Sequence, residues 1–325
     1  MEIEPHPPNA ERHRPEAVSR DSMKSVVTHL RGVAITSPWL LHLLVADVVL
    51  SLLLPLRPLA PRLVYNVSSR IAESVWGWIQ AIFERVNGAH IVCSGDVLPP
   101  GESAIVIVNH VAWSDFYMIQ ALARRAAMLG RCRYFVKRQL RMVPFLGWGL
   151  WAIGMPMVSR NWIKDEEELN HVFSGIVNCG FPTWLISFSE ATRFSKIKYD
   201  ESRAWCKKVD KPQPMHLLYP RTKGFIATVR HLRKAPQVKA VYDLSIAYQH
   251  DRTFQSAPTM WETLSVPGLS RRHGFKFHVH ARRFPMETLP DTDDELARWL
   301  EDRWMEKGEW LEATRKRWMA QAAQA

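Results

Sequence analysis

Cysteine is scarce in this sequence. The 325-residue chain has four cysteines and none of them belongs to a Cys-x-x-Cys pair. Small secreted domains use closely spaced cysteines for disulfide frameworks, and structural zinc sites use them as ligands. Their absence argues against both kinds of scaffold and favours a reducing compartment. A chain of this length can bury enough apolar surface to fold without such cross-links.

Other signatures are also missing. No Gly-x-Ser-x-Gly elbow occurs, which disfavours a serine hydrolase of the α/β-hydrolase fold. There is no RNP-type aromatic motif and no Cys/His finger spacing, so we do not expect nucleic acid as a partner. Lysine and arginine nevertheless outnumber aspartate and glutamate by 43 to 32, a net charge of +11. Anionic lipid and phosphorylated small molecules are the partners that such a charge favours.

Acidic residues are absent from Phe116 to Arg160. The stretch carries eight basic residues, interleaved with apolar side chains such as Trp148 and Trp151. Without a counter-charge nearby in sequence, these cations favour an anionic lipid surface or an anionic substrate opposite them. The basic residues are Arg124, Arg125, Arg131, Arg133, Lys137, Arg138, Arg141 and Arg160.

A single long apolar run follows a polar N-terminus. Residues 1–30 show no apolar periodicity and no early apolar core, so we expect a solvated tail without a signal peptide. The run from Val33 to Leu54 is interrupted by His42 and Asp47, and roughly 20 apolar residues cross roughly 30 Å of hydrocarbon. An aspartate at mid-bilayer costs about 2.5–3.5 kcal/mol, so a re-entrant or interface-lying helical hairpin competes with a true crossing.

Three prolines end this run, and an amphipathic pattern follows. Apolar residues from Ile71 to Val86 recur at three- and four-residue steps, which predicts a helix packed on the domain or lying on the membrane. We therefore expect residues 31–88 to form a membrane-associated helical hairpin.

Short apolar runs alternate with helical stretches from about residue 90 onward. This texture predicts an α/β domain over residues 89–290, with a buried, mostly parallel sheet flanked by helices. Residues 291–325 read as a C-terminal helix, because acidic residues come first and basic ones last, as the helix dipole favours. The expected strands are 104–108, 153–158, 184–188, 238–244 and 275–279.

The first of these strands leads into a His-x4-Asp pair. Residues five apart on a regular helix lie about 140° apart, so His110 and Asp115 meet only if His110 lies in the turn before the helix. Asp115 would then fix the imidazole tautomer and leave the other nitrogen as a base for an alcohol. We interpret Ser114 as a helix-start residue. Alone the pair is a weak signal, because chance produces such spacing readily.

Two further clusters suit anion binding. The strand 184–188 ends at Glu190, Thr192 and Arg193, where a guanidinium and a hydroxyl suit phosphate, although a surface ion pair would read the same. The hexapeptide 220–225 combines cations, a hydroxyl and a glycine and includes Lys223. A group of three histidines among four arginines predicts an exposed basic strand rather than a metal site, because no carboxylate or thiolate lies nearby in sequence. These histidines are His273, His278 and His280.

The order of these pieces resembles the PlsC-like glycerolipid acyltransferases, and more narrowly the eukaryotic 1-acyl-sn-glycerol-3-phosphate and lysophospholipid acyltransferases. The resemblance covers roughly residues 90–250. Its blocks are Asn109-His110-x4-Asp115, Gly154 to Arg160, Phe188-x-Glu190-x-Thr192-Arg193, Leu218 to Phe225, and Val241-Tyr242-Asp243.

The resemblance implies a glycerol-3-phosphate acyltransferase-like fold and an acyl-CoA-dependent enzyme. In that family a histidine such as His110 takes the proton from the hydroxyl of a lysophospholipid, and an aspartate such as Asp115 orients it. Arg160, Glu190, Thr192 and Arg193 match residues that hold the glycerol phosphate of the acceptor. Lys223 falls in a block associated with the shape of the substrate pocket. No cofactor or metal is implied beyond acyl-CoA as co-substrate.

One block departs from the family pattern. The third block commonly reads Phe-Pro-Glu-Gly-Thr-Arg, whereas Ser189 and Ala191 replace the proline and the glycine here. If the glycine serves for a positive φ, Ala191 costs about 1 kcal/mol, and this departure weakens the expectation of lysophosphatidate as the acceptor.

Three functional readings follow. The first is esterification of lysophosphatidic acid to phosphatidic acid, and the second is remodelling of lysophosphatidylinositol or lysocardiolipin. A hypothesis of a different functional class is a non-catalytic lipid-binding protein that retains the fold. The apolar segment and the unpaired cysteines predict a membrane location, at the endoplasmic reticulum with the catalytic domain facing the cytosol.

Overall fold

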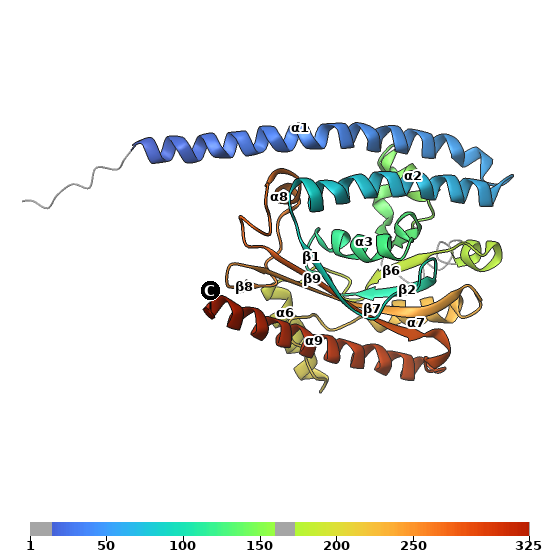
Figure 1. Cartoon of the computed structure of the whole chain (residues 1–325). Coiled ribbons are helices and arrows are strands. Elements are labelled where there is room, and N and C mark those ends of the chain that lie inside the picture. The colour runs from blue at the N-terminus through green and yellow to red at the C-terminus, as the bar shows by residue number, and fades with distance from the viewer. Residues whose placement is uncertain (1–14, 160–172, 325) are drawn as a thin grey trace, which may run out of the picture.

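The computed structural model describes residues 15–159 and 173–324, with side chains from residue 25 onward. Its helices and sheet form layers (Figure 1). A helical hairpin of α1 (Pro15–Leu53) and α2 (Pro61–Ala81) covers α3 (Asp115–Arg125), which lies on one face of the sheet. Helices α7 (Thr222–Leu232) and α9 (Asp293–Gln324) cover the opposite face. The helices on both faces explain why the central runs 104–108 and 184–188 are almost entirely apolar.

The sheet has seven strands and is mostly parallel, as the sequence predicts. Strand β9 runs antiparallel to β7, and the short β8 (Thr253–Phe254) also pairs antiparallel with β7. The order across the sheet is β1 (Ile91–Gly95), β9 (Lys276–Pro285), β7 (Val238–His250), β2 (Ser103–Val108), β6 (Trp184–Phe188) and β3 (Cys132–Tyr134).

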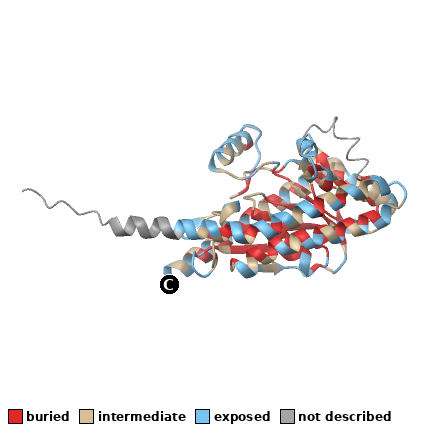
Figure 2. Cartoon of the chain, turned by 90° about the horizontal axis from the view of Figure 1, so that it is seen from above, coloured by how far each residue is buried: buried red, intermediate tan, exposed pale blue. Residues whose placement is uncertain are grey.

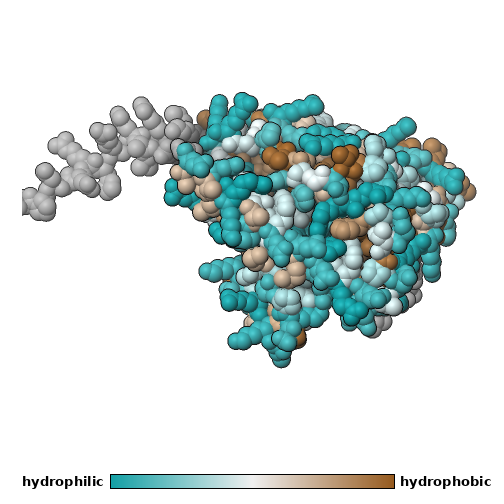
Figure 3. Space-filling view, turned by 60° about the horizontal axis from the view of Figure 1, so that its bottom comes forward, coloured by the Kyte–Doolittle hydropathy of each residue, from teal (hydrophilic) through white to brown (hydrophobic). Residues whose placement is uncertain are grey.

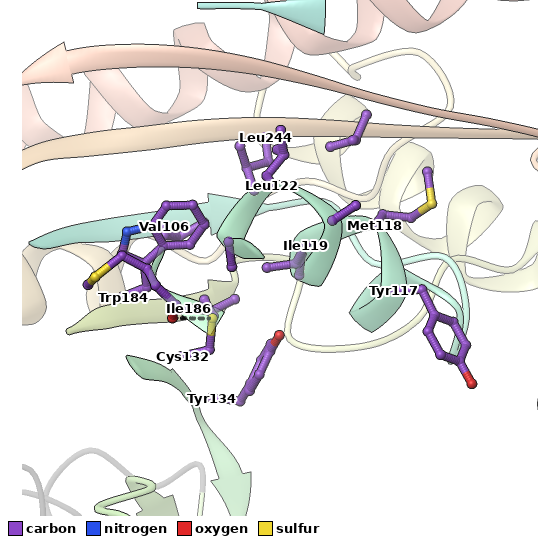
Figure 4. Packing of buried hydrophobic residues seen from close by; sticks show 14 of the residues in the cluster. Val106, Tyr117, Met118, Ile119, Leu122, Cys132, Tyr134, Trp184, Ile186 and Leu244 are labelled. Atoms are coloured by element: carbon purple, nitrogen blue, oxygen red, sulfur yellow. Dashed lines mark hydrogen bonds between the residues drawn. The ribbon is translucent and has the colours of Figure 1, made fainter. Parts of the chain in front are cut away.

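Alternate side chains of the central strand β2 fill two separate cores. Val106 points to the α3 side, where it packs with Ile119 and Trp184 (Figure 4). Ile105 and Ile107 point to the side of α7 and α9. Because successive side chains of a strand face opposite ways, the continuous apolar run 104–108 serves both cores at once. Packing on both faces of the sheet therefore fixes the position of β2.

Smaller elements surround this frame. They are α4 (Leu146–Ala152), α6 (Lys196–Lys208), α8 (Met260–Ser265), the strand pair β4 (Val136–Lys137) and β5 (Met157–Val158), a π-helical turn (Ile82–Val86) and 3-10 turns at Leu54–Leu56, Leu129–Arg131, Arg138–Met142 and Met286–Thr288. The strand expected over 153–158 is reduced to β5, because Gly154 turns the chain with a φ of 82°.

The polar interruptions of the N-terminal apolar run face the protein. His42 Nε2 lies 3.0 Å from the Ser74 hydroxyl of α2. Asp47 is buried, and its carboxylate points at Gly149 of α4, leaving no space for a Cβ there. The opposite side of α1 is apolar and exposed (Figure 2). It presents Val26, Val27, Leu30, Val33, Leu40, Leu41, Leu44, Val45, Val49 and Leu52, the outer apolar face.

The structure corrects two expectations, one about the N-terminal tail and one about the basic stretch after Phe116. The solvated tail expected over residues 1–30 ends earlier, since α1 begins at Pro15. Proline is favoured in the first turn of a helix, and extending an existing helix costs little free energy, so an apolar pattern is not required there.

The basic stretch after Phe116 also finds partners in the chain. Arg124 pairs with Glu84 at 2.6 Å, and the buried Arg133 donates to the Gly130 carbonyl at 3.0 Å.

Candidate active site

A tight turn follows the carboxyl end of β2 and carries the first block. The Asn109 side chain donates to the Ile246 carbonyl at 3.0 Å and accepts from the Ile246 N–H at 2.8 Å. These two bonds tie the turn to β7 in the middle of the sheet. Ser114 is the N-cap residue of α3, which confirms its interpretation as a helix-start residue. The turn is therefore fixed at both ends.

His110 lies in this turn and contacts Asp115, as the spacing predicts. His110 Nδ1 is 2.8 Å from Asp115 Oδ2, and the Asp115 side chain is fully buried while that of His110 is 15% exposed. The same carboxylate oxygen accepts the N–H of Val111 at 2.7 Å and of Ala112 at 3.1 Å. Asp115 Oδ1 accepts the hydroxyl of Tyr248 at 2.8 Å. The carboxylate thus has four donors in a fixed arrangement.

This arrangement sets the tautomer of the imidazole. An ionised carboxylate only accepts hydrogen bonds, so Nδ1 of His110 carries the proton and Nε2 is left with a lone pair. Phe188 holds the ring from one side, with centroids 4.0 Å apart and planes at 24°. A histidine held in this way can act as a general base toward a group that approaches Nε2.

Glu190 joins the blocks behind this pair. One oxygen accepts the N–H of His110 and the other that of Leu218, both at 3.3 Å. Burial raises the pKa of Glu190 to about 8, against the lowering effect of these two N–H groups. Glu190 does not line the cavity described below. It connects the loops through their main chains instead.

Main-chain bonds complete the assembly of the blocks. The Phe194 N–H donates to the His110 carbonyl at 2.7 Å, and the Arg221 N–H donates to the Ser189 carbonyl at 2.7 Å. The first, third and fourth blocks therefore meet at the carboxyl ends of β2 and β6. Ligands of open α/β sheets bind in such places.

A cavity of about 660 Å³ opens beside His110. Its apolar wall includes Phe135, Val158, Phe188 and Trp205. Cations gather at the same cavity, namely Lys137, Lys211, Arg221 and Lys223, with Glu301 as its single acidic residue among the described ones. Lys211 pairs with Glu301 at 2.5 Å, and no ion pair joins the other three to a described carboxylate. Within the described part of the chain, the cavity therefore combines an apolar wall with three cations that have no carboxylate partner.

The predicted binding residues are placed unequally. Lys223 lines the cavity. Arg193 is exposed and outside the cavity lining, and its guanidinium has no ion pair with the described residues. The Thr192 hydroxyl accepts a hydrogen bond from the Lys198 ammonium. Arg160 lies outside the described residues.

Ala191 adopts a left-handed conformation, with a φ of 57°. This position therefore does have the positive φ that glycine would accommodate without strain. A non-glycine residue in this region carries a cost of about 1–2 kcal/mol. The turn nevertheless retains the bond from the Ala191 N–H to the Phe188 carbonyl at 2.9 Å.

Sequence reasoning missed several residues of this site. Lys137 and Arg221 line the cavity, and each lay within a basic stretch that had been noted as a whole. Tyr248, which donates to Asp115, had no signal at all, because it lies beyond the end of the expected strand 238–244. β7 continues past the ends of β2 and β6 and so carries Tyr248 to the site.

The fold and the site define an α/β protein with a His/Asp pair at the carboxyl end of its central strand. Residues 90–249 match the model of the Acyltransferase family, and residues 269–313 match the model of the Acyltransferase C-terminus. The chain belongs to this acyltransferase family, which confirms the family that the ordered blocks indicate.

The chain is also similar in sequence to individual acyltransferases. The chain is 29% identical over 256 residues to 1-acyl-sn-glycerol-3-phosphate acyltransferase 2 of Brassica oleracea, covering 78% of this chain and 63% of that protein. It is 28% identical over 258 residues to lysocardiolipin acyltransferase 1 of Gallus gallus, covering 79% of this chain and 66% of that protein. The chain thus spans somewhat less than two thirds of the length of these relatives.

A solved structure is also similar. The crystal structure of the 1-acyl-sn-glycerophosphate (LPA) acyltransferase PlsC from Thermotoga maritima aligns with a TM-score of 0.46 and 14% identity, covering 85% of this chain and 98% of that one.

Proposed function

We propose that the chain is an acyl-CoA-dependent acyltransferase that esterifies the free hydroxyl of a lysophospholipid, most simply lysophosphatidic acid to phosphatidic acid. The observation that carries the proposal is the His110–Asp115 pair at the wall of a cavity with cations around it. The family and the names of the relatives support the class of reaction.

In the proposed reaction, His110 Nε2 takes the proton of the acceptor hydroxyl while the oxygen attacks the thioester carbonyl. The tetrahedral intermediate collapses, the carbon–sulfur bond breaks, and the imidazolium returns the proton to the CoA thiolate. An ester and free CoA result, and no acyl-enzyme is needed. Asp115 stabilises the imidazolium that forms in between. A general base of this kind contributes about 10²–10⁴ to the rate.

The charges at the cavity suit both substrates. In this proposal Lys137, Arg221 and Lys223 contact the phosphates of CoA and of the acceptor. A guanidinium or ammonium favours phosphate when it has no carboxylate partner, and these three have none among the described residues. The apolar wall suits acyl chains. Glu190 acts in this proposal as a positioning residue for the His110 loop rather than as a ligand of the acceptor.

We also propose that the outer apolar face lies in a membrane interface. The segment Ser25–Leu56 is long and apolar enough to cross a bilayer, and an 18-residue window within it has a mean hydropathy of 2.1. A crossing would surround the helix with lipid, yet His42 and Asp47 on its inner side contact α2 and α4. One apolar side and one protein-facing side are typical of a helix that lies along the surface. The site would then open near its lipid acceptor.

The first test replaces His110 by alanine. We expect transfer to fall by at least about 10²-fold, since the base is lost, with unchanged expression and membrane association. The control is His273→Ala, which removes an exposed histidine far from the cavity in sequence. Release of free thiol from acyl-CoA on addition of lysophosphatidic acid is the readout. Near-wild-type release by His110→Ala would contradict the role of the base.

A panel of acceptors separates the remaining readings. The lysocardiolipin acyltransferase among the relatives favours remodelling of headgroup-bearing lipids as the second candidate. A strong preference of purified protein for lysocardiolipin or lysophosphatidylinositol over lysophosphatidic acid would support that candidate. Absence of thiol release with every acceptor would instead support a non-catalytic lipid-binding protein.

A further inference from the structure

A second cavity, of about 490 Å³, lies away from His110. It is formed by β1, the first residues of β9 and the last turns of α9, and we call it the edge pocket because β1 is the edge strand of the sheet. Its lining is His90, Val92, Ser94, Ser270, Phe275, Lys276, Phe277, His278, Arg317, Trp318 and Gln321. The proposed transfer reaction uses none of these residues.

The charge of the edge pocket is of one sign. Lys276 and Arg317 line it together with His90, and no carboxylate is among its described lining residues. Lys276 makes no ion pair with a described residue; its ammonium lies 5.7 Å from the centre of the Trp318 ring. Burial lowers the pKa of Lys276. A partly desolvated cation without a counter-charge favours an anion as its partner.

His278 of β9 lines the inner wall, and its burial corrects the expectation of an exposed basic strand at this position, whereas His273 is exposed as expected. His278 is buried, its Nε2 lies 2.7 Å from the Ser94 hydroxyl, and that hydroxyl is also 3.0 Å from His280 Nδ1. Burial, and next the charge of Arg317, lower the pKa of His278 to about 4. The imidazole therefore stays neutral at ordinary pH, and the positive charge of the pocket belongs to its rim.

Aromatic rings line the same cavity. Trp318 packs beneath the Lys276 ammonium, and Phe275 stacks on His250 with centroids 4.0 Å apart. Flat aromatic surfaces beside cations suit a ligand that has both a planar ring and an anionic group, because rings stack on aromatic side chains while phosphate is held by lysine and arginine.

The edge pocket is separate from the reaction cavity and from the outer apolar face. Glu301 lines the reaction cavity and Arg317 the edge pocket, and they are sixteen positions apart along α9, about 24 Å at about 1.5 Å per residue. His278 contacts Trp310 of α9, which is on the opposite side of the sheet from α1 (Figure 1). This underside is largely hydrophilic (Figure 3). A bilayer against α1 would not reach the pocket, which favours a water-soluble ligand.

We propose that the edge pocket binds a nucleoside phosphate, with the base against Trp318 and Phe275 and the phosphates between Lys276 and Arg317. A free nucleotide and the nucleotide end of CoA share this chemistry. The inference goes beyond the proposed transfer reaction and does not depend on it, because no residue of the His110 site takes part.

The test measures binding of ADP to the full-length protein in detergent micelles by calorimetry. We expect saturable binding that weakens at least tenfold in Arg317→Gln. The matched control is Lys316→Gln, which removes the same charge from the neighbouring position of α9, where the side chain is 72% exposed and outside the pocket. We expect this control to bind as the wild type does. Pyrophosphate, which has the anion without the ring, should bind at least tenfold more weakly than ADP.

Several outcomes would overturn the proposal. The protein could fail to bind ADP, or it could bind pyrophosphate as tightly as ADP. It could bind palmitate more tightly than ADP, with the same dependence on Arg317. Finally, Arg221→Gln could weaken ADP binding while Arg317→Gln does not. The last outcome would place the nucleotide in the reaction cavity. Competition by CoA for the Arg317-dependent site would identify the nucleotide end of CoA as the ligand, and its absence would identify a free nucleotide. Thiol release measured on the same variants keeps this test apart from that of the transfer reaction.

Discussion

Replacing Asp115 by asparagine would remove one negative charge from the His110 site with little change of shape. The asparagine oxygen can take the place of Asp115 Oδ2, where His110 Nδ1 and the N–H groups of Val111 and Ala112 converge. Its amide nitrogen then replaces Oδ1 and donates to Tyr248, whose hydroxyl can accept as well as donate. The opposite orientation would leave buried donors facing donors, each at a cost of about 1–3 kcal/mol. The variant should therefore keep the tautomer of His110.

The expected loss comes from the charge alone. Two unit charges about 4 Å apart attract by about 4 kcal/mol at an effective dielectric constant of about 20. The imidazolium that forms during transfer would lose this attraction, and about 1.36 kcal/mol corresponds to a tenfold change in rate. We therefore expect kcat to fall by up to about 1,000-fold. KM should change little, because in this mechanism the attraction acts on the imidazolium that forms during transfer.

The assay follows thiol release with saturating acyl-CoA and lysophosphatidic acid, on protein in detergent micelles. Thermal unfolding of the same sample verifies that the fold is retained. Tyr248→Phe serves as a companion variant, because it removes one donor to Asp115 and leaves the charge. We expect it to lower kcat by less than Asp115→Asn does. A rate of Asp115→Asn within about tenfold of wild type would refute the reasoning.

Three further predictions concern stability. Ala191→Gly should raise the free energy of unfolding by about 0.5–1 kcal/mol, because the strain relieved at the left-handed residue exceeds the entropy that glycine adds to the unfolded chain. Denaturant titration checks this, with Ala121→Gly in α3 as a control that should be destabilising. The raised pKa of Glu190 means that its contribution to stability is complete below about 4.5, falls as pH rises and is lost above about 8. Glu190→Gln should therefore lose less thermal stability than wild type between about pH 5 and about pH 9, and parallel curves would contradict the assignment. Gly149→Ala would place a methyl group against the Asp47 carboxylate and should cost about 1–3 kcal/mol, whereas Gly77→Ala on α2, with its nearest neighbour at 3.8 Å, should cost nothing.

The central strands could be predicted from sequence because burial on both faces makes them continuous apolar runs. Strands β2 and β6 fall on the expected residues. Strand β1 could not be predicted in the same way, since Cys93, Ser94 and Gly95 give it a polar texture that suits an edge. The partners of the basic stretch were also hidden. Glu84, which pairs with Arg124, comes from a different helix, and sequence proximity does not reveal such pairs.

The contact between His110 and Asp115 could be predicted because it is local, within one turn. The roles of distant residues could not. Glu190 was expected to bind the acceptor, yet its oxygens are occupied by main-chain N–H groups, which a sequence motif does not distinguish from a ligand site. Arg193 was expected at the phosphate, whereas Lys137 and Arg221 line the cavity. A motif locates a loop, but the direction of each side chain depends on the elements packed against it.

The way in which the blocks are joined explains how this site can depart from the family motif. The bonds from Phe194 to His110 and from Arg221 to Ser189 join main-chain N–H groups to main-chain carbonyls. Any residue except proline supplies such an N–H, and every residue supplies the carbonyl. Serine in place of proline at position 189 therefore leaves the second bond intact. Alanine at position 191 costs only its local backbone strain. The demand for a particular side chain is concentrated where the chemistry is proposed, at the imidazole and its carboxylate, and it is there that substitution should abolish transfer rather than merely weaken the fold.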